Sequence, residues 1–259
     1  MRYSRRVFKF IERRVTIKNK LNCKIIVPFF NDLKNFQAFI NEIDLLDLDE
    51  NYFLLFDNGS QDKKIEETFL NNKSVIKSCS VLRSENNLGY GGGILHASKF
   101  VEEDYICWMP GNMKIKPIEA IKLIADDNNK KINLLVKAKR VNRPILDSIK
   151  TKAFGLAFSF KFKKLFFDLG GTPNIIEKNI LLNLSNPPQH YSFDAFIYYF
   201  AVKNKFKVKR PKISYTKRLH GNSHWQNGIS SELKLAKDIL SQKKLWDSEV
   251  LTYLKKNNQ

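Results

Sequence analysis

The sequence YICWMPGNMKIKP, residues 105–117, decides how the rest of this chain is interpreted. Its apolar run has the length of a strand and stops abruptly at Pro110 and Gly111, which predicts a buried strand ending at a loop. Ligands bind at the carboxyl ends of strands in open α/β sheets, so this loop is a candidate binding site. Its polar side chains are Asn112 and Lys114.

Strands and helices alternate on both sides of this stretch. Apolar runs predict strands at 23–28, 52–56 and 75–82, and each is followed by residues with helical spacing. A helix that starts at Pro117 and a strand at 132–136 complete the array. This alternation predicts an α/β fold with a mostly parallel central sheet flanked by helices.

The second half of the chain is less regular. Its patterns predict a helix over 148–167, a Gly-rich turn over 168–174, helices over 177–184 and 193–202, two short strands within 206–215 and a final amphipathic helix over 230–245.

The length and composition fit one large α/β domain with short additions at its ends. The chain has 259 residues, of which 43% are hydrophobic, enough to build a sizeable core. We divide it into a basic N-terminal arm (1–21), the main domain (22–228) and a C-terminal helical extension (229–259). The arm is either an amphipathic helix on anionic lipid or a solvated, frayed terminus.

The charge and the cysteines limit the partners and the compartment. A formal charge of +19 attracts nucleotides, nucleic acid or anionic lipid. The cysteines Cys23, Cys79 and Cys107 lie far apart in apolar runs, which indicates buried, reduced thiols. The N-terminus carries basic residues without the apolar segment of a secretion signal, and no apolar run is long enough to span a bilayer. We therefore expect a cytoplasmic protein.

Three motifs in order resemble the N-terminal half of family 2 glycosyltransferases of the GT-A (Rossmann-like) fold. They are VPFFND at 27–32, FDNGS at 56–60 and RSENNLG at 83–89. The order and spacing of these motifs, rather than any one of them, carry the resemblance.

Later motifs look like those of the polyprenyl-phosphate (dolichol-phosphate-mannose-like) branch of that family. They are Arg140, DLGGT at 168–172, Phe193 with Asp194, and RLHGNS at 218–223. The resemblance implies transfer of a sugar, with inversion, from a UDP or GDP sugar to a polyprenyl phosphate or a lipid-linked glycan.

The resemblance also implies a donor site. Asp57 can accept hydrogen bonds from the nucleobase or ribose, or it makes a turn with the residues after it. The glycine run at 89–93 opens a helix, so its amides can approach a phosphate, although a tight turn also needs glycine. The donor-binding residues implied are Pro28, Asn31, Asp57, Asn86, Gly89, Gly91, Asn112, Lys114, Arg218 and His220.

A metal cofactor is not expected. Relatives hold Mg²⁺ or Mn²⁺ with an Asp-x-Asp, where this chain has Pro110, Gly111 and Asn112. Asn112 offers one neutral oxygen at most, a poor match for a hard cation, although Mg²⁺ or Mn²⁺ remains the alternative. Lys114 is a candidate to replace the charge of the metal ion on the diphosphate, or it is one more solvated lysine.

The acceptor side is implied to comprise Arg140, Asp168 and Asp194. Asp194 is a general base if the acceptor is a sugar hydroxyl, is not needed as a base if the acceptor is a phosphate, or acts like a helix N-cap. Arg140 and Arg143 are further candidates for binding phosphate, and Asp168 organises a loop that also touches the acceptor.

A stretch rich in Phe and Lys, residues 150–167, predicts docking on a membrane surface, because Phe enters the headgroup boundary while Lys meets anionic lipid. A core helix with solvated lysines is the alternative. We thus predict a peripheral enzyme at the cytoplasmic face of a membrane, able to form a homo-oligomer. A non-catalytic GT-A module that binds nucleotide or lipid is the competing hypothesis, and nucleic-acid binding is not expected because no recognisable module is visible.

Overall fold

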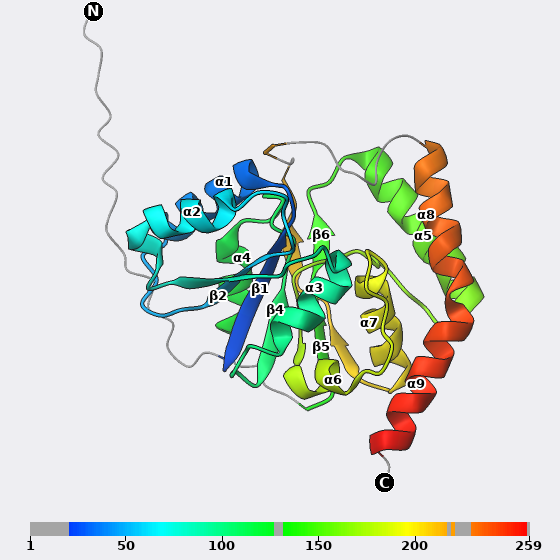
Figure 1. Ribbon diagram of the computed structural model, residues 1–259. Helices are drawn as coiled ribbons and strands as arrows, with labels where there is room; N and C mark the ends of the chain where they lie inside the picture. Colours follow the sequence, from blue (N-terminus) through cyan, green and yellow to red (C-terminus); the bar gives the residue numbers. More distant parts are fainter. Residues whose placement is uncertain (1–20, 127–131, 217–218, 221–228, 258–259) are drawn as a thin grey trace, which may run out of the picture.

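The computed structural model describes residues 21–126, 132–216, 219–220 and 229–257, and Figure 1 shows their arrangement in three layers. The middle layer is a sheet of seven strands in the order β3-β2-β1-β4-β7-β5-β8. These strands are β1 (Cys23–Phe29), β2 (Phe53–Asp57), β3 (Cys79–Arg83), β4 (Tyr105–Trp108), β5 (Leu134–Lys137), β7 (Asn174–Glu177) and β8 (Lys207–Lys209). The strands β6 (Lys139–Val141) and β9 (Lys212–Ser214) form a separate parallel pair.

The sheet is mostly parallel, as the alternation of strands and helices predicted. Only β7 runs antiparallel, and it lies between β4 and β5. The sequence did not predict this strand: a turn was expected up to residue 174 and a helix from 177, whereas Asn174–Glu177 pairs with both neighbours. The insertion of β7 between β4 and β5 brings Asn174 to the edge of the sheet where these strands end.

One helical layer covers the first face of the sheet. It contains α1 (Leu33–Leu45), α2 (Lys64–Asn71) and α4 (Pro117–Ile124), with a short 3-10 turn at Lys73–Val75. In α1, apolar residues at helical spacing point into the core. Helix α4 begins at Pro117, a position where the missing N–H of proline costs nothing. The third strand starts at Cys79 rather than at residue 75, because Val75 ends the 3-10 turn.

The second face carries more helices and a highly aromatic core. Its helices are α3 (Gly89–Ser98), α5 (Ile145–Phe162), α6 (Lys178–Asn183), α7 (Phe193–Lys203), α8 (Ile229–Ser241) and α9 (Lys243–Asn257). Figure 1 shows α8 and α9 running along one side of the molecule beside α5. The single helix expected over 230–245 is therefore two helices, and α5 starts at Ile145, three residues before the predicted start at 148.

The Phe-rich stretch 150–167 divides its aromatic residues between the core and the surface, and α5 ends at Phe162, five residues before the predicted end at 167. Phe158 and Phe162 stack in the core at a centroid distance of 3.9 Å, and Phe166 packs edge-on against Phe158. Phe160, in contrast, is 89% exposed. The alternative of a core helix therefore holds for Phe158 and Phe162, and docking of the exposed residues on a membrane stays a prediction. The basic arm lies outside the described residues except for Leu21, which is buried.

Candidate functional site

The parallel strands bring their carboxyl ends to one edge of the sheet. Asp57 ends β2, Arg83 ends β3 and Lys137 ends β5, and the loop after β4 begins at the same edge. The sequence therefore places charged side chains where open α/β sheets bind ligands. They fall into two groups, one beyond β1 to β3 and one around β4, β7 and β5.

The first group is centred on Asp57, whose exposure is 1%. Its carboxylate forms an ion pair with the Arg83 guanidinium and accepts a hydrogen bond from the Ser60 amide at 3.0 Å. Arg83 also donates to the Ser60 carbonyl at 2.6 Å. Asp57 thus makes the turn that DNGS chemistry indicates, and Arg83 holds it in place. The sequence analysis named Arg83 in a motif without assigning it this role.

Two asparagines connect the neighbouring loops. Asn31 accepts a bond from the Gln61 amide at 2.9 Å, and its own amide donates to the Ser60 hydroxyl at 2.9 Å. Asn58, which the sequence analysis did not single out, accepts from the Leu88 amide at 3.0 Å. The predicted donor residue Asn86 is exposed in this loop, and Pro28 is half-buried in β1.

The glycine run at the start of α3 packs against another segment of the chain. A Cβ on Gly89 would lie 2.5 Å from the Gln189 carbonyl oxygen, and one on Gly91 would lie 2.5 Å from that of Pro188. The Gly92 amide donates to Gln189 at 2.9 Å. Gly89 also has a φ of +74°. These glycines allow the backbone at residues 188–189 to approach α3 closely. The glycine run therefore has a structural reason, and phosphate binding by it stays a hypothesis.

The loop after β4 is held by its own contacts. A Cβ on Gly111 would lie 2.3 Å from the Phe29 ring, and the Asn112 side-chain oxygen accepts from the Lys114 amide at 3.2 Å. The Thr216 amide donates to the Lys114 carbonyl at 2.9 Å. Lys114 itself is half-buried. Pro110, Gly111 and Asn112 offer no carboxylate to a divalent ion, and the Asn112 amide oxygen is engaged in the turn.

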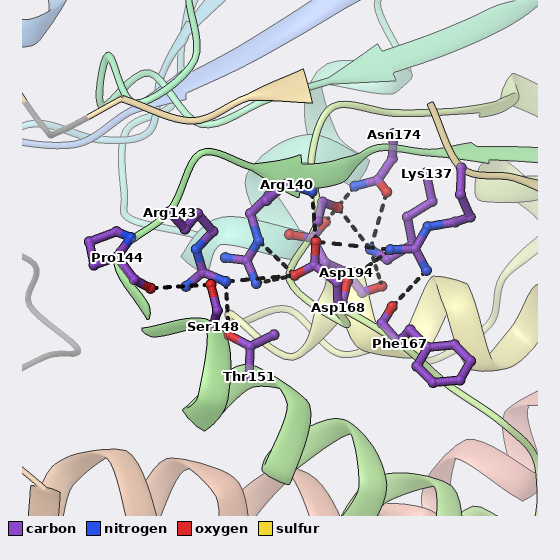
Figure 2. A network of polar contacts seen from close by, with 12 residues as sticks. Lys137, Arg140, Arg143, Pro144, Ser148, Thr151, Phe167, Asp168, Asn174 and Asp194 are labelled. Carbon is purple, nitrogen blue, oxygen red and sulfur yellow. Dashed lines mark hydrogen bonds and ion pairs between the residues drawn. The ribbon is translucent and has the colours of Figure 1, made fainter. Parts of the chain in front are cut away.

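The second group contains an aspartate surrounded by arginines, as Figure 2 shows. Asp168 accepts from Arg140 Nε at 2.7 Å and from the Arg140 amide at 2.8 Å. The guanidiniums of Arg143 and Arg210 each lie 4.0 Å from its carboxylate. Burial alone would raise the pKa of Asp168, but Arg140 outweighs it and the pKa is lowered. Three guanidiniums face one carboxylate, which leaves a positive excess.

Asp194 lies in the first turn of α7 and belongs to the same region (Figure 2). Its Oδ1 accepts from Trp108 Nε1 at 2.8 Å and from Asn174 Nδ2 at 3.0 Å. Burial raises its pKa, although Lys137 and the Trp108 bond oppose the rise. Ser192, rather than Asp194, is the N-cap residue of α7. Asp194 thus follows the cap in the first turn of α7, where the helix-cap interpretation expected it, and its carboxylate also bonds to side chains of two strands.

Lys137 completes this group and was missed by the sequence analysis. Its side chain is fully buried, and Nζ donates to the Gly171 carbonyl at 2.9 Å, to Asn174 Oδ1 at 3.2 Å and to the Asp194 carbonyl at 3.3 Å. A lysine at the end of an apolar strand is normally exposed, so its residue type hides the role. The one available signal was its position at a strand end, three residues before Arg140.

The remaining predicted residues lie at the rim or outside the described part. The His220 side chain is exposed, and its carbonyl accepts from Asn35 Nδ2 at 3.1 Å. Arg218 falls outside the described residues.

A mostly parallel sheet of seven strands between two helical layers is a fold of the GT-A type. Residues 24–182 match the model of glycosyl transferase family 2, which covers more than half of the chain, so the chain belongs to that family. It is accordingly an enzyme that transfers a sugar from a nucleotide sugar.

Solved structures agree with the fold. Glucosyl-3-phosphoglycerate synthase from Mycobacterium tuberculosis, in complex with Mn²⁺, UDP and glucosyl-3-phosphoglycerate, is 14% identical, with a TM-score of 0.60 over 88% of this chain and 80% of that chain. The same enzyme with UDP alone is 13% identical, with a TM-score of 0.59 over 91% and 79%. Its complex with Mn²⁺, UDP-glucose and glycerol 3-phosphate is 11% identical, with a TM-score of 0.58 over 88% and 80%. No curated protein matches the chain.

Proposed function

We propose that this glycosyltransferase transfers a sugar, with inversion and without a divalent metal, to an acceptor that carries a phosphate. The observation that carries the proposal is the arginine cluster around Asp168, which lies beside Asp194 at the edge of the sheet. One guanidinium can donate two parallel hydrogen bonds to two phosphate oxygens. An excess of positive charge in a partly buried site favours binding of an anion. A fold-level relative crystallised with phosphoglyceric acid supports an anionic acceptor.

The donor would occupy the ends of β1 to β3. Asp57 and Arg83 fix the turn after β2 that would face the base or ribose, and the loops around Asn31 and Asn86 border it. His220 and Arg218 are assigned to the diphosphate as in the sequence analysis. UDP is the preferred nucleotide, because the fold-level relative was crystallised with UDP and with UDP-glucose.

In the reaction the acceptor oxygen forms a bond to the anomeric carbon as the bond to the diphosphate breaks. A phosphate acceptor is already an anion, so Arg140 and Arg143 need only hold it in line, and no proton has to be removed. A sugar hydroxyl would instead give its proton to Asp194, whose raised pKa suits a base. Lys114 supplies positive charge for the leaving diphosphate.

The preferred acceptor is a polyprenyl phosphate in a membrane. Among the described residues, every helix is too short or too polar to cross a bilayer. Helix α5 instead exposes apolar side chains between lysines, namely Ile145, Leu146, Ile149, Leu156 and Phe160. Arg143 donates to Thr151 of this helix at 2.8 Å, so the arginine cluster adjoins the exposed face. A peripheral position at the cytoplasmic face of the membrane follows from this proposal.

The test is a turnover assay with UDP and GDP sugars, offered polyprenyl phosphate in vesicles or a soluble phosphorylated acid, with and without EDTA. We expect turnover that survives EDTA and falls about 100-fold in Lys114→Ala, the size of losing one transition-state contact. Lys116→Ala is the control, since Lys116 is exposed and paired with Glu42 at 3.0 Å. Complete loss with EDTA and rescue by Mn²⁺ would refute metal independence. Binding without turnover of any donor would instead favour a non-catalytic module.

A further inference from the structure

Lys137 is a buried cation that connects two parts of the acceptor side. Its ammonium reaches the Gly171 carbonyl in the turn after Asp168 and the Asp194 carbonyl in the first turn of α7. Asn174, which accepts from the same ammonium, donates in turn to the Asp194 carboxylate. The three acceptors thus come from the Gly-rich turn, the antiparallel strand β7 and helix α7, and Figure 2 shows Lys137 facing Asn174 and Asp194.

Burying the Lys137 ammonium costs free energy, which points to a role for this residue beyond filling the core. A lysine with no exposed surface gives up its hydration, and an apolar residue of similar size would avoid that cost. Burial lowers the pKa of Lys137 to about 7, while Asp194 and Asp168 oppose the shift and Arg210 and Arg140 add to it. The ring of Tyr198 also faces the cation, with its centroid 5.7 Å from Nζ.

We propose that Lys137 is a positioning residue for the acceptor, which sets the Asp168 turn and Asp194 at a fixed distance from each other. The inference rests on the proposed function, in which both aspartates lie on the acceptor side. Lys137 ends β5, whereas Asp57 and Arg83 end β2 and β3, so we expect its loss to affect the acceptor more than the donor.

The protonation state of Lys137 determines how firmly it holds the Asp168 turn and Asp194. An ammonium has three N–H donors for its three acceptors, whereas a neutral amine has two and a lone pair. Raising the pH through about 7 therefore leaves one buried acceptor without a donor. The Asp168 turn and the start of α7 are then held less firmly. We expect the affinity for the acceptor to fall while the affinity for the donor stays constant.

The experiment compares Lys137→Met with Lys139→Met, which removes an exposed lysine two residues away. We expect Lys137→Met to raise the KM for the acceptor by about tenfold or more and to leave the KM for the donor within about twofold. The wild type should lose acceptor affinity above pH 7, and Lys137→Met should not show this pH dependence. Equal effects on both substrates, or an unchanged pH profile in the variant, would overturn the proposal.

A second measurement does not depend on turnover. The Trp108 indole N–H donates to Asp194, so its NMR resonance reports the position of that carboxylate. In the wild type this resonance should shift with a midpoint near pH 7, and in Lys137→Arg, which stays charged, it should not. A resonance that titrates identically in both proteins refutes the role of Lys137. Absence of turnover in the wild type, with the expected shift present, refutes the proposed function alone.

Discussion

Asp168 holds together the charges of the proposed acceptor side, since Arg140, Arg143 and Arg210 all face its carboxylate. Asp168→Asn keeps the shape of the side chain and removes the charge, which leaves the guanidiniums without their partner. We expect a loss of about 3 kcal/mol in the free energy of unfolding at pH 7, typical of breaking a buried ion pair. Urea denaturation gives the value.

The pH dependence of this loss has a defined sign. The pKa of Asp168 is lowered in the folded protein, so its charge stabilises the fold above the unfolded value of about 3.9. That contribution disappears as the pH falls through the folded pKa. The difference between wild type and variant should therefore shrink at pH 3. The exposed Asp62→Asn should have little effect at either pH, and an equal difference for Asp168→Asn at pH 7 and pH 3 would contradict the account.

The residues of this region also show what a sequence can reveal at this scale. Arg140, Asp168 and Asp194 were assigned to the acceptor from a resemblance of motifs, and the fold brings Arg140 and Asp168 into contact. Lys137 was missed because residue type alone makes a lysine look solvated. The burial of Lys137 becomes evident only from the structure, in which β7, starting at Asn174, lies beside the end of β5.

Among the elements, helix α5 is the one that the proposed membrane docking depends on. Phe160→Ser removes an exposed apolar side chain from its surface without touching the core. Burying a Phe contributes about 1.5–3 kcal/mol, so we expect binding to anionic vesicles to weaken about tenfold or more. Co-sedimentation with vesicles measures this. Leu70→Ser on α2, also exposed but across the sheet, is the matched control, and equal loss in both variants would argue against docking through α5.

The strands and helices were predictable to different degrees. Strands β1, β2 and β4 are apolar runs that stop at turn residues, so their existence and order follow from local pattern. β7 has only four residues and is followed directly by α6, so the sequence shows no separate apolar run for this strand. Its direction depends on β4 and β5, elements far away in the sequence, and local spacing carries no information on such pairing.

At the scale of the whole molecule, the C-terminal helices complete the second core. Trp246 of α9 is 1% exposed and packs against Phe162, Phe196 and Tyr199 at centroid distances of 5.3, 5.6 and 5.9 Å. Trp246→Ala should lower the free energy of unfolding by about 3–5 kcal/mol, because the core cannot refill so large a volume.

Leu245→Ala is the control for this change. Leu245 is the preceding residue and is 66% exposed, so its truncation should cost less than about 0.5 kcal/mol. Chemical denaturation of both variants measures the difference. Similar losses in the two proteins would mean that α9 is not part of the cooperative core.

The antiparallel strand β7 has a consequence for synthesis on the ribosome. β1 to β4 are all made by residue 108, and they can pair as soon as they emerge. The second edge of β4 pairs with β7, so it stays unpaired until residues 174–177 have been made. During that time the backbone amides and carbonyls of this apolar strand are exposed. Such an edge is a template for pairing with another chain. The nascent protein therefore passes through an interval of aggregation risk that ends only when β7 is in place.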